Sequence, residues 1–196
     1  MIYHYPHKRA KQQACQLGVT LLELMITLAI AAILVTLVAP SVQTIVASNR
    51  IAAQINDTSA AIQFARYQAI DKQTTAIICP SSDFSSCNNA NWNLAKIVFI
   101  DANLNNQRDA NEDLLYSTQE VVGDLVFTGP ANTVGFVESG ASLNANASFI
   151  KLCPSDRNVK FARALNINQQ GRVRLSRDSD NDDIHEDISG TALSCT

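Results

Sequence analysis

Apolar residues are concentrated near the start of the chain, in a run from Val19 to Ala39 that contains one acidic residue, Glu23. After Pro40 the apolar positions recur at the spacing of an amphipathic helix. The pattern therefore predicts one helix from Val19 to about Lys72. Proline lacks an amide hydrogen, so Pro40 is expected to kink this helix, and the periodicity that resumes beyond it indicates that the helix continues.

The rest of the chain alternates between short apolar segments and turn-rich stretches, a pattern typical of strands. We predict strands at Thr75–Cys79, Lys96–Ile100, Leu114–Ser117, Leu125–Thr128, Val134–Val137, Phe149–Leu152, Ala164–Ile167 and Arg172–Ser176. One helix followed by a series of strands predicts an α+β fold, in which the long N-terminal α-helix packs on an antiparallel β-sheet head.

The acidic residue in the apolar run indicates that this segment does more than anchor the chain. An ionised side chain at the centre of a membrane-spanning segment costs at least about 2.5 kcal/mol, so Glu23 is expected to have a partner. An ordinary secretory signal is cut after its apolar region, whereas the expected cleavage point here, after Gly18, precedes it. We predict a cleaved leader at residues 1–18, a transmembrane or filament-core helix at 19–46, and a globular head at 47–196.

The junction sequence Gly18-Val19-Thr20-Leu21-Leu22-Glu23 resembles the class III signal of type IV pilins and type II secretion pseudopilins. The resemblance implies that a prepilin peptidase cuts between Gly18 and Val19 and methylates Val19, where the family usually has Phe. It also implies that Glu23, at the fifth mature position, neutralises the N-terminal amine of a neighbouring subunit during assembly. Pro40 matches the proline that bends the family's long helix.

The sequence of the head resembles one branch of this family, the GspH/FimT branch of pseudopilins and minor pilins. The similar segments are Phe64–Ile70, Ile77–Cys87, Trp92 and Ile97–Asn105, and with the signal they extend to about Tyr116. The branch implies a bacterial inner-membrane protein with a single pass and a periplasmic head. It implies incorporation into a pilus or pseudopilus with other major and minor pilins.

Composition and histidine positions exclude several functions. The chain of 196 residues has room for one domain plus the terminal helix. Its formal charge is −3, and loss of a leader with three cations and no anions leaves −6, so any nucleic-acid contact must be local. His4 and His7 lie in the leader and His185 in an acidic tail, and glycine-rich phosphate loops are absent, so we do not expect an enzyme.

Four cysteines remain after the leader, which carries Cys15. If the basic N-terminus stays in the cytoplasm, the head is exported to an oxidising compartment, where cysteines pair. Four cysteines allow three connectivities, and loop geometry favours Cys79–Cys87 with Cys153–Cys195. Cys-x2-Cys spacing is missing, so we expect no zinc site.

A polar loop follows the second predicted strand. Asp101, Asn103, Asn105, Asp109 and Glu112 stand at positions one, three, five, nine and twelve of a calcium-loop spacing. The usual glycine is replaced by an asparagine. The alternative is a polar hairpin loop held by side-chain to backbone hydrogen bonds, which we favour, so no cofactor or metal is expected and calcium is the alternative.

Positive charge is concentrated between Lys151 and Arg177, with seven cations and one acid. Within it, Gly171-Arg172-Val173-Arg174 places two arginines on one face of a strand, where they can grip successive phosphates, and the glycine lets a backbone come close. This segment resembles the Gly-Arg-x-Arg motif of FimT minor pilins, which implies binding of double-stranded DNA for uptake in natural transformation. The residues assigned to DNA binding are Arg172, Arg174, Gly171, Arg177, Lys160 and Arg163.

An acidic run, residues 178–187, follows the arginines and contains six anions. It can neutralise the arginines, bind a cation or repel DNA. Two hypotheses therefore stand: a FimT-like, DNA-binding minor pilin, or a purely structural GspH/FimU-like subunit that primes or caps the filament. Only Phe149 and Phe161 lie near the motif, so phosphate contact is expected to dominate over base stacking. The sequence does not distinguish competence, motility and secretion.

Overall fold

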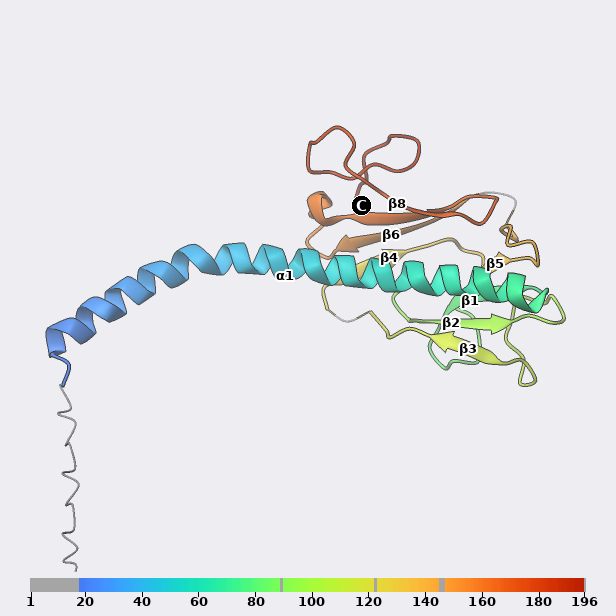
Figure 1. Cartoon of the computed structure of the whole chain (residues 1–196), viewed down its shortest axis with the longest axis horizontal. Coiled ribbons are helices and arrows are strands. Elements are labelled where there is room, and N and C mark those ends of the chain that lie inside the picture. Colours follow the sequence, from blue (N-terminus) through green and yellow to red (C-terminus); the bar gives the residue numbers. More distant parts are fainter. Residues whose placement is uncertain (1–17, 89, 122, 145–146, 196) are drawn as a thin grey trace, which may run out of the picture. The chain divides into compact units, whose positions relative to one another are not determined.

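The computed structural model describes residues 18–88, 90–121, 123–144 and 147–195, and for residues 37–41 only the helical backbone (Figure 1). The chain divides into two compact units, Met1–Gln43 and Thr44–Thr196. All but the last residue of the predicted leader lies outside the described residues, so the leader stays a prediction.

The predicted helix is present as α1, Leu21–Lys72 (Figure 1). Thr20 caps its first turn, because its Oγ1 accepts a hydrogen bond from the Glu23 amide at 3.2 Å. The helical backbone continues through residue 40, and the kink predicted at Pro40 stays a prediction. Among the described residues, no helix is both long and apolar enough to cross a membrane.

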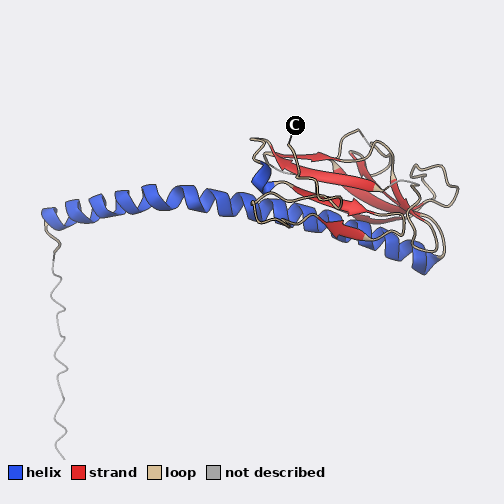
Figure 2. Cartoon of the chain, turned by 90° about the horizontal axis from the view of Figure 1, so that it is seen from above, coloured by secondary structure: helices blue, strands red, loops and turns tan. Residues whose placement is uncertain are grey.

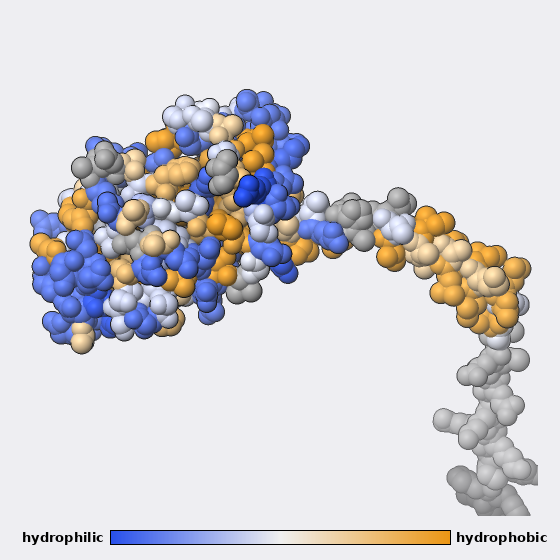
Figure 3. Space-filling view, turned by 180° about the vertical axis from the view of Figure 1, so that it is seen from behind, coloured by the Kyte–Doolittle hydropathy of each residue, from blue (hydrophilic) through white to orange (hydrophobic). Residues whose placement is uncertain are grey.

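The first turns of α1 carry a mostly apolar surface, drawn largely in orange in Figure 3. The exposed side chains are Leu21, Leu22, Leu24, Met25, Ile26, Leu28, Ile30, Ile33, Leu34 and Val35. Apolar surfaces of this extent normally mark contact with other proteins or with lipid.

The strands form two antiparallel sheets of four strands each (Figure 2). The first has the order β3-β2-β1-β5 and consists of β1 (Ala76–Ser81), β2 (Ala95–Ile100), β3 (Leu114–Ser117) and β5 (Val134–Phe136). The second has the order β4-β6-β7-β8 and consists of β4 (Leu125–Thr128), β6 (Ser148–Pro154), β7 (Arg163–Ile167) and β8 (Val173–Leu175). A short 3-10 helix, η1 (Val159–Phe161), joins β6 to β7.

The predicted α+β class is confirmed, and each predicted strand overlaps an observed one. The strands divide into two sheets where the sequence pattern indicated one. The division arises at β4, which does not continue the first sheet from β3 but pairs with β6, with Val126 opposite Cys153. Such pairing depends on contacts between distant segments, which alternation within a strand does not encode.

One core lies between the second half of α1 and both sheets. The helix contributes buried Ile51, Ile55 and Ile62, together with Ala65 and Ala69. The first sheet adds Ile78, Val98 and Phe136, and the second adds Phe127, Ile150, Leu152, Leu165 and Ile167. Burying one isoleucine contributes about 1.5–3 kcal/mol to the stability of the fold. Because three isoleucines of the helix are buried in the core that both sheets share, the helix holds the two sheets together.

A disulfide-linked segment lies against the opposite face of each sheet. Cys79 pairs with Cys87 over the face of the first sheet that carries Ile77, Ile97 and Phe99. Cys153 pairs with Cys195, which fixes the C-terminal segment to the second sheet, and the Cα atoms of the two pairs are 5.5 and 5.8 Å apart. The pairing favoured by loop geometry is therefore present.

Candidate functional site

The N-terminal signal residues lie at the exposed start of α1. Gly18, Val19 and Glu23 are all exposed. Glu23 occupies the third helical position after the Thr20 cap, where a carboxylate also interacts favourably with the positive end of the helix dipole. Two physical roles are thus available to Glu23, capping its own helix and pairing with a cation outside it. Cleavage and methylation stay predictions.

The two motif arginines lie on the edge of the second sheet. Arg174 is in the edge strand β8, opposite Asn166, and Arg172 is in the turn that joins β7 to β8. The turn is closed by Asn168, whose Oδ1 accepts from the Arg172 amide at 2.8 Å and whose carbonyl accepts from the Gly171 amide at 2.9 Å. Both arginine side chains are exposed.

Gly171 is needed for a contact within the protein. Its φ is +73°, and a Cβ added to it would lie 2.0 Å from the carbonyl oxygen of Gly140 and 2.8 Å from Nε of Arg66. The backbone that lies close to Gly171 therefore belongs to the protein itself, whereas the sequence-based interpretation was that the glycine lets a bound ligand approach. Glycine is required here because both the left-handed conformation and the close approach exclude a side chain.

A groove of about 390 Å³ separates the C-terminal turns of α1 from β8. Arg172 and Arg174 line one wall, and Arg66 and Tyr67 line the other. Arg66 also holds the walls together, because its Nε donates to Gly140 O at 2.8 Å and its Nη2 to the carbonyl of Gln170 at 3.4 Å. Sequence reasoning missed both helix residues, since no local pattern reports a contact between the helix and the last strand.

The other assigned cations differ in their availability. Arg177 is exposed at the end of β8. Lys160 Nζ forms an ion pair with Asp183 Oδ2 at 3.0 Å. Arg163 donates from Nη1 to the carbonyls of Ala162 and Lys160, at 2.7 and 3.0 Å, and burial lowers its pKa. Arg163 thus serves the fold around η1, and the assigned cations that are exposed and form no ion pair among the described residues are Arg172, Arg174 and Arg177.

The acidic run does not pair with the motif arginines. Among the described residues, Lys160–Asp183 is the only ion pair that the run makes, and neither Arg172 nor Arg174 forms one with any acid. Instead, the carboxylates of the run accept hydrogen bonds from nearby amides, such as Asp178 from the amides of Asn181 and Asp183 at 2.7 and 3.0 Å.

The candidate calcium loop after β2 is held by its own hydrogen bonds. The buried Asp101 accepts two backbone amides of the loop at 3.1 and 2.9 Å, and Glu112 accepts two more at 2.8 and 3.0 Å. Asn103 and Asn105 both donate from Nδ2 to Asp109 Oδ2, at 2.6 and 3.0 Å. This geometry favours the hydrogen-bonded polar loop.

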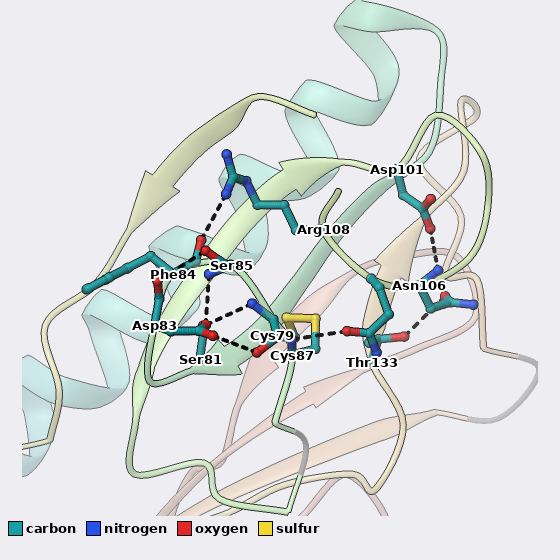
Figure 4. Close-up of a disulfide and its surroundings, with 12 residues drawn as sticks. Cys79, Ser81, Asp83, Phe84, Ser85, Cys87, Asp101, Asn106, Arg108 and Thr133 are labelled. Atoms are coloured by element: carbon teal, nitrogen blue, oxygen red, sulfur yellow. Dashed lines mark hydrogen bonds between the residues drawn. A yellow bond between two sulfur atoms is a disulfide. The ribbon is translucent and has the colours of Figure 1, made fainter. Parts of the chain in front are cut away.

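The same loop is tied to the first disulfide and its surroundings (Figure 4). Arg108 donates from Nη1 to the carbonyl of Phe84 at 3.1 Å, in the segment closed by Cys79–Cys87. Thr133 Oγ1 donates to Asn106 Oδ1 at 3.2 Å. The loop is therefore a scaffold element at one end of the first sheet.

A serine and a histidine meet in the C-terminal segment without forming a nucleophilic pair. His185 Nδ1 lies 2.8 Å from the carbonyl oxygen of Ser176 and 3.2 Å from its Oγ. Because a carbonyl only accepts, Nδ1 carries the proton and is not a base toward the hydroxyl. Burial, with the nearby charge of Arg163, lowers the pKa of His185. The contact secures the segment to β8.

Sequence comparison gives two matches to protein families. The model of type II transport protein GspH matches residues 54–179, and that of the prokaryotic N-terminal methylation motif matches residues 13–39. A comparison with curated proteins gave no match.

Structure comparison identifies similar folds among solved pilins. The type IV minor pilin FimU of Pseudomonas aeruginosa is 18% identical, with a TM-score of 0.55 over 76% of this chain and 96% of FimU. The minor pseudopilin EpsH from the type 2 secretion system of Vibrio cholerae is 15% identical, with a TM-score of 0.42 over 63% of this chain and 94% of EpsH. Because the GspH model covers more than half of the sequence, the chain belongs to the type II transport protein GspH family.

Proposed function

We propose that this chain is a minor subunit of a type IV pilus or type II secretion-like filament that binds extracellular double-stranded DNA for uptake. The binding surface consists of Arg172 and Arg174, with Arg177 beside them and Arg66 and Tyr67 across the groove. Phosphate contacts dominate on this surface, so binding is independent of DNA sequence and sensitive to salt.

The observation that carries the DNA-binding proposal is the free state of the two motif arginines. Arg174 lies exposed on the edge strand β8 and Arg172 in the turn before it, both line a groove, and no acid among the described residues forms an ion pair with them. Guanidinium groups in this arrangement retain their donors for phosphate oxygens. Tyr67, which is 59% exposed, adds one aromatic face that a base can contact.

The subunit part of the proposal rests on family membership and on the N-terminal helix. A prepilin peptidase releases the leader between Gly18 and Val19 and methylates Val19. The apolar start of α1 anchors the chain in the inner membrane, with the head in the periplasm, before it enters the filament beside other major and minor pilins. Glu23 then pairs with the N-terminal amine of a neighbouring subunit.

The second candidate is a purely structural minor subunit that primes or caps the filament. Two observations favour it: Lys160 is neutralised by Asp183, and Arg163 is used by the fold. Such a subunit contacts only other pilins.

A salt-series titration of the head, residues 44–196, against mixed-sequence duplex DNA separates the two. We expect affinity to fall steeply with salt. The double variant Arg172→Gln/Arg174→Gln should bind at least about tenfold more weakly at low salt, with a shallower salt slope, because two phosphate contacts are lost. Circular dichroism establishes that both proteins are folded.

The matched control removes the same charge elsewhere. Arg50 and Arg157 are exposed and lie outside the groove, so Arg50→Gln/Arg157→Gln should bind nearly as the wild type does. Equal losses in the two double variants would mean diffuse attraction with no site. No binding by the folded wild-type head at low salt would leave the structural subunit as the function.

A further inference from the structure

The loop that follows β8 directs four carboxylates toward one point. Its base is closed by the Glu186 amide, which donates to the carbonyl of Arg177 at 2.9 Å. Within it, Asn181 and Asp183 have φ of 65° and 69°, so the chain turns tightly. One carboxylate oxygen from each of four residues lies within 4.8 Å of the others, and the four are Asp178, Asp180, Asp182 and Glu186.

Each of the three aspartates in this cluster keeps capacity for another ligand. Asp180 and Asp182 each accept one backbone amide through Oδ1, at 3.3 and 2.8 Å. Both oxygens of Asp178 accept an amide, and a carboxylate oxygen with one hydrogen bond still has a free lone pair. The backbone amides thus orient the side chains and leave oxygen atoms directed at one another.

Glu186 supplies an independent observation. The residue is only 6% exposed. Its Oε2 accepts from the amide and Oγ of Ser179, at 2.7 and 2.5 Å, whereas its Oε1 is buried and has no hydrogen-bond partner among the described residues. Leaving a buried charged oxygen unpaired is unfavourable, and such atoms in folded proteins normally meet a donor, a water or an ion.

The charges around the cluster also favour a bound cation. Lys160, the cation paired with the run, contacts Asp183, which is not one of the four. Four carboxylates at this separation repel one another, and a bound dication relieves the repulsion.

We propose that Asp178, Asp180, Asp182 and Glu186 bind one calcium ion. The donor set is entirely oxygen and includes neither sulfur nor imidazole, which suits a hard cation. Calcium fits better than magnesium, because it accepts irregular geometry and many carboxylate ligands, whereas magnesium requires a small octahedron and keeps its waters.

The test is calorimetric titration of the full-length chain in detergent micelles with calcium chloride, after treatment with a chelator. We expect one site with a dissociation constant of roughly 0.1–1 mM, the range of extracellular calcium modules, and much weaker binding of magnesium. Asp180→Asn and Glu186→Gln should each weaken calcium binding by about tenfold or more, since each removes a charged ligand. Asp180 is exposed, so Asp180→Asn keeps the test valid if Glu186→Gln fails to fold.

The control is Asp183→Asn, which removes the same charge from the same loop but lies outside the cluster. It should retain calcium binding within about twofold. Equal weakening in Asp183→Asn and Asp180→Asn would indicate diffuse attraction of cations to the acidic run and would overturn the site. Absence of heat and of any rise in Tm at 10 mM calcium, in the folded wild type, would overturn it as well. No DNA is present, so the result is independent of the proposed function.

Discussion

Lys96 in β2 is an unusual buried residue, because its ionisable side chain is only 1% exposed. Its Nζ lies 4.3 Å from the centroid of the Phe127 ring, a cation–π contact across the two sheets. Burial lowers the pKa of Lys96 to about 8, and the charges of Asp57 and Glu120 oppose the shift. The charged ammonium of Lys96 therefore lies in a buried site that favours the neutral amine.

The lowered pKa of Lys96 predicts a stability that rises with pH. Between the folded pKa, about 8, and the ordinary value, 10.5, the unfolded chain binds more protons than the folded one. The free energy of unfolding of the head should therefore increase by about 1.5 kcal/mol from pH 8 to pH 9.5. Denaturant titration followed by the fluorescence of the buried Trp92 measures it.

Lys96→Met is the comparison for this pH effect. It keeps the length and the apolar stem but does not titrate, so its unfolding free energy should stay flat over the same interval. A rise of equal size in the variant would assign the effect to another group. The raised pKa of Tyr116 places its own ionisation above this interval.

At the scale of single residues, the sequence predicted which side chains are exposed better than which partners they bind within the fold. The exposure of Arg172 and Arg174 was predictable, because side chains alternate between the two faces of a strand. The clamp formed by Arg66 and the burial of Lys96 were not predictable, because each depends on segments distant in sequence. The bonds of Arg163 to the carbonyls of Lys160 and Ala162 are local, but they depend on the backbone path around η1. The convergence of the four carboxylates is also local and depends on the left-handed turns at Asn181 and Asp183.

At the scale of elements, α1 and the strands were predictable because periodicity is a local property. The predicted helix end at Lys72 and the limits of β3 and β4 are those observed. The partition into two sheets was not predictable, since β1 and β2 are buried on both faces and lack the alternation that would indicate which face meets the helix.

The β7–β8 hairpin gives a prediction at this scale. Gly171→Ala should lower the free energy of unfolding by about 3 kcal/mol, because the new Cβ meets the Gly140 carbonyl and the left-handed φ is strained. Gly190→Ala is the matched control: its φ is also positive, +81°, but a Cβ there meets nothing within 4 Å. That variant should lose only about 1 kcal/mol.

Urea denaturation of both glycine variants in the head measures the difference. Equal losses at the two positions would mean that backbone strain alone acts at Gly171 and that the contact with Gly140 relaxes without cost. A larger loss at Gly171 confirms that the motif glycine is part of the packing between the hairpin and the segment that follows β5.

For the whole molecule, the exposed apolar start of α1 offers a surface for contact with other subunits or with lipid. We expect Glu23→Ala to reduce incorporation into filaments at least about tenfold, because the charge that we propose pairs with a neighbouring subunit is lost. Immunoblotting of sheared filaments against the membrane fraction measures it. Glu23→Gln separates charge from capping, since glutamine at the third helical position also supports the capping box. Normal incorporation of Glu23→Gln would assign Glu23 to the helix cap.

The two disulfides limit how far the head can be extended by a pulling force. Cys153 and Cys195 are 42 residues apart in sequence, and Cys79 and Cys87 are 8 apart. An extended chain spans at most about 3.6 Å per residue, so the two links withhold roughly 150 Å and roughly 30 Å of extension from a pulled head. A force applied between α1 and the chain end is therefore transmitted through Cys153–Cys195, and the segment that carries Arg172 and Arg174, which lies inside this closed loop, is not stretched by it.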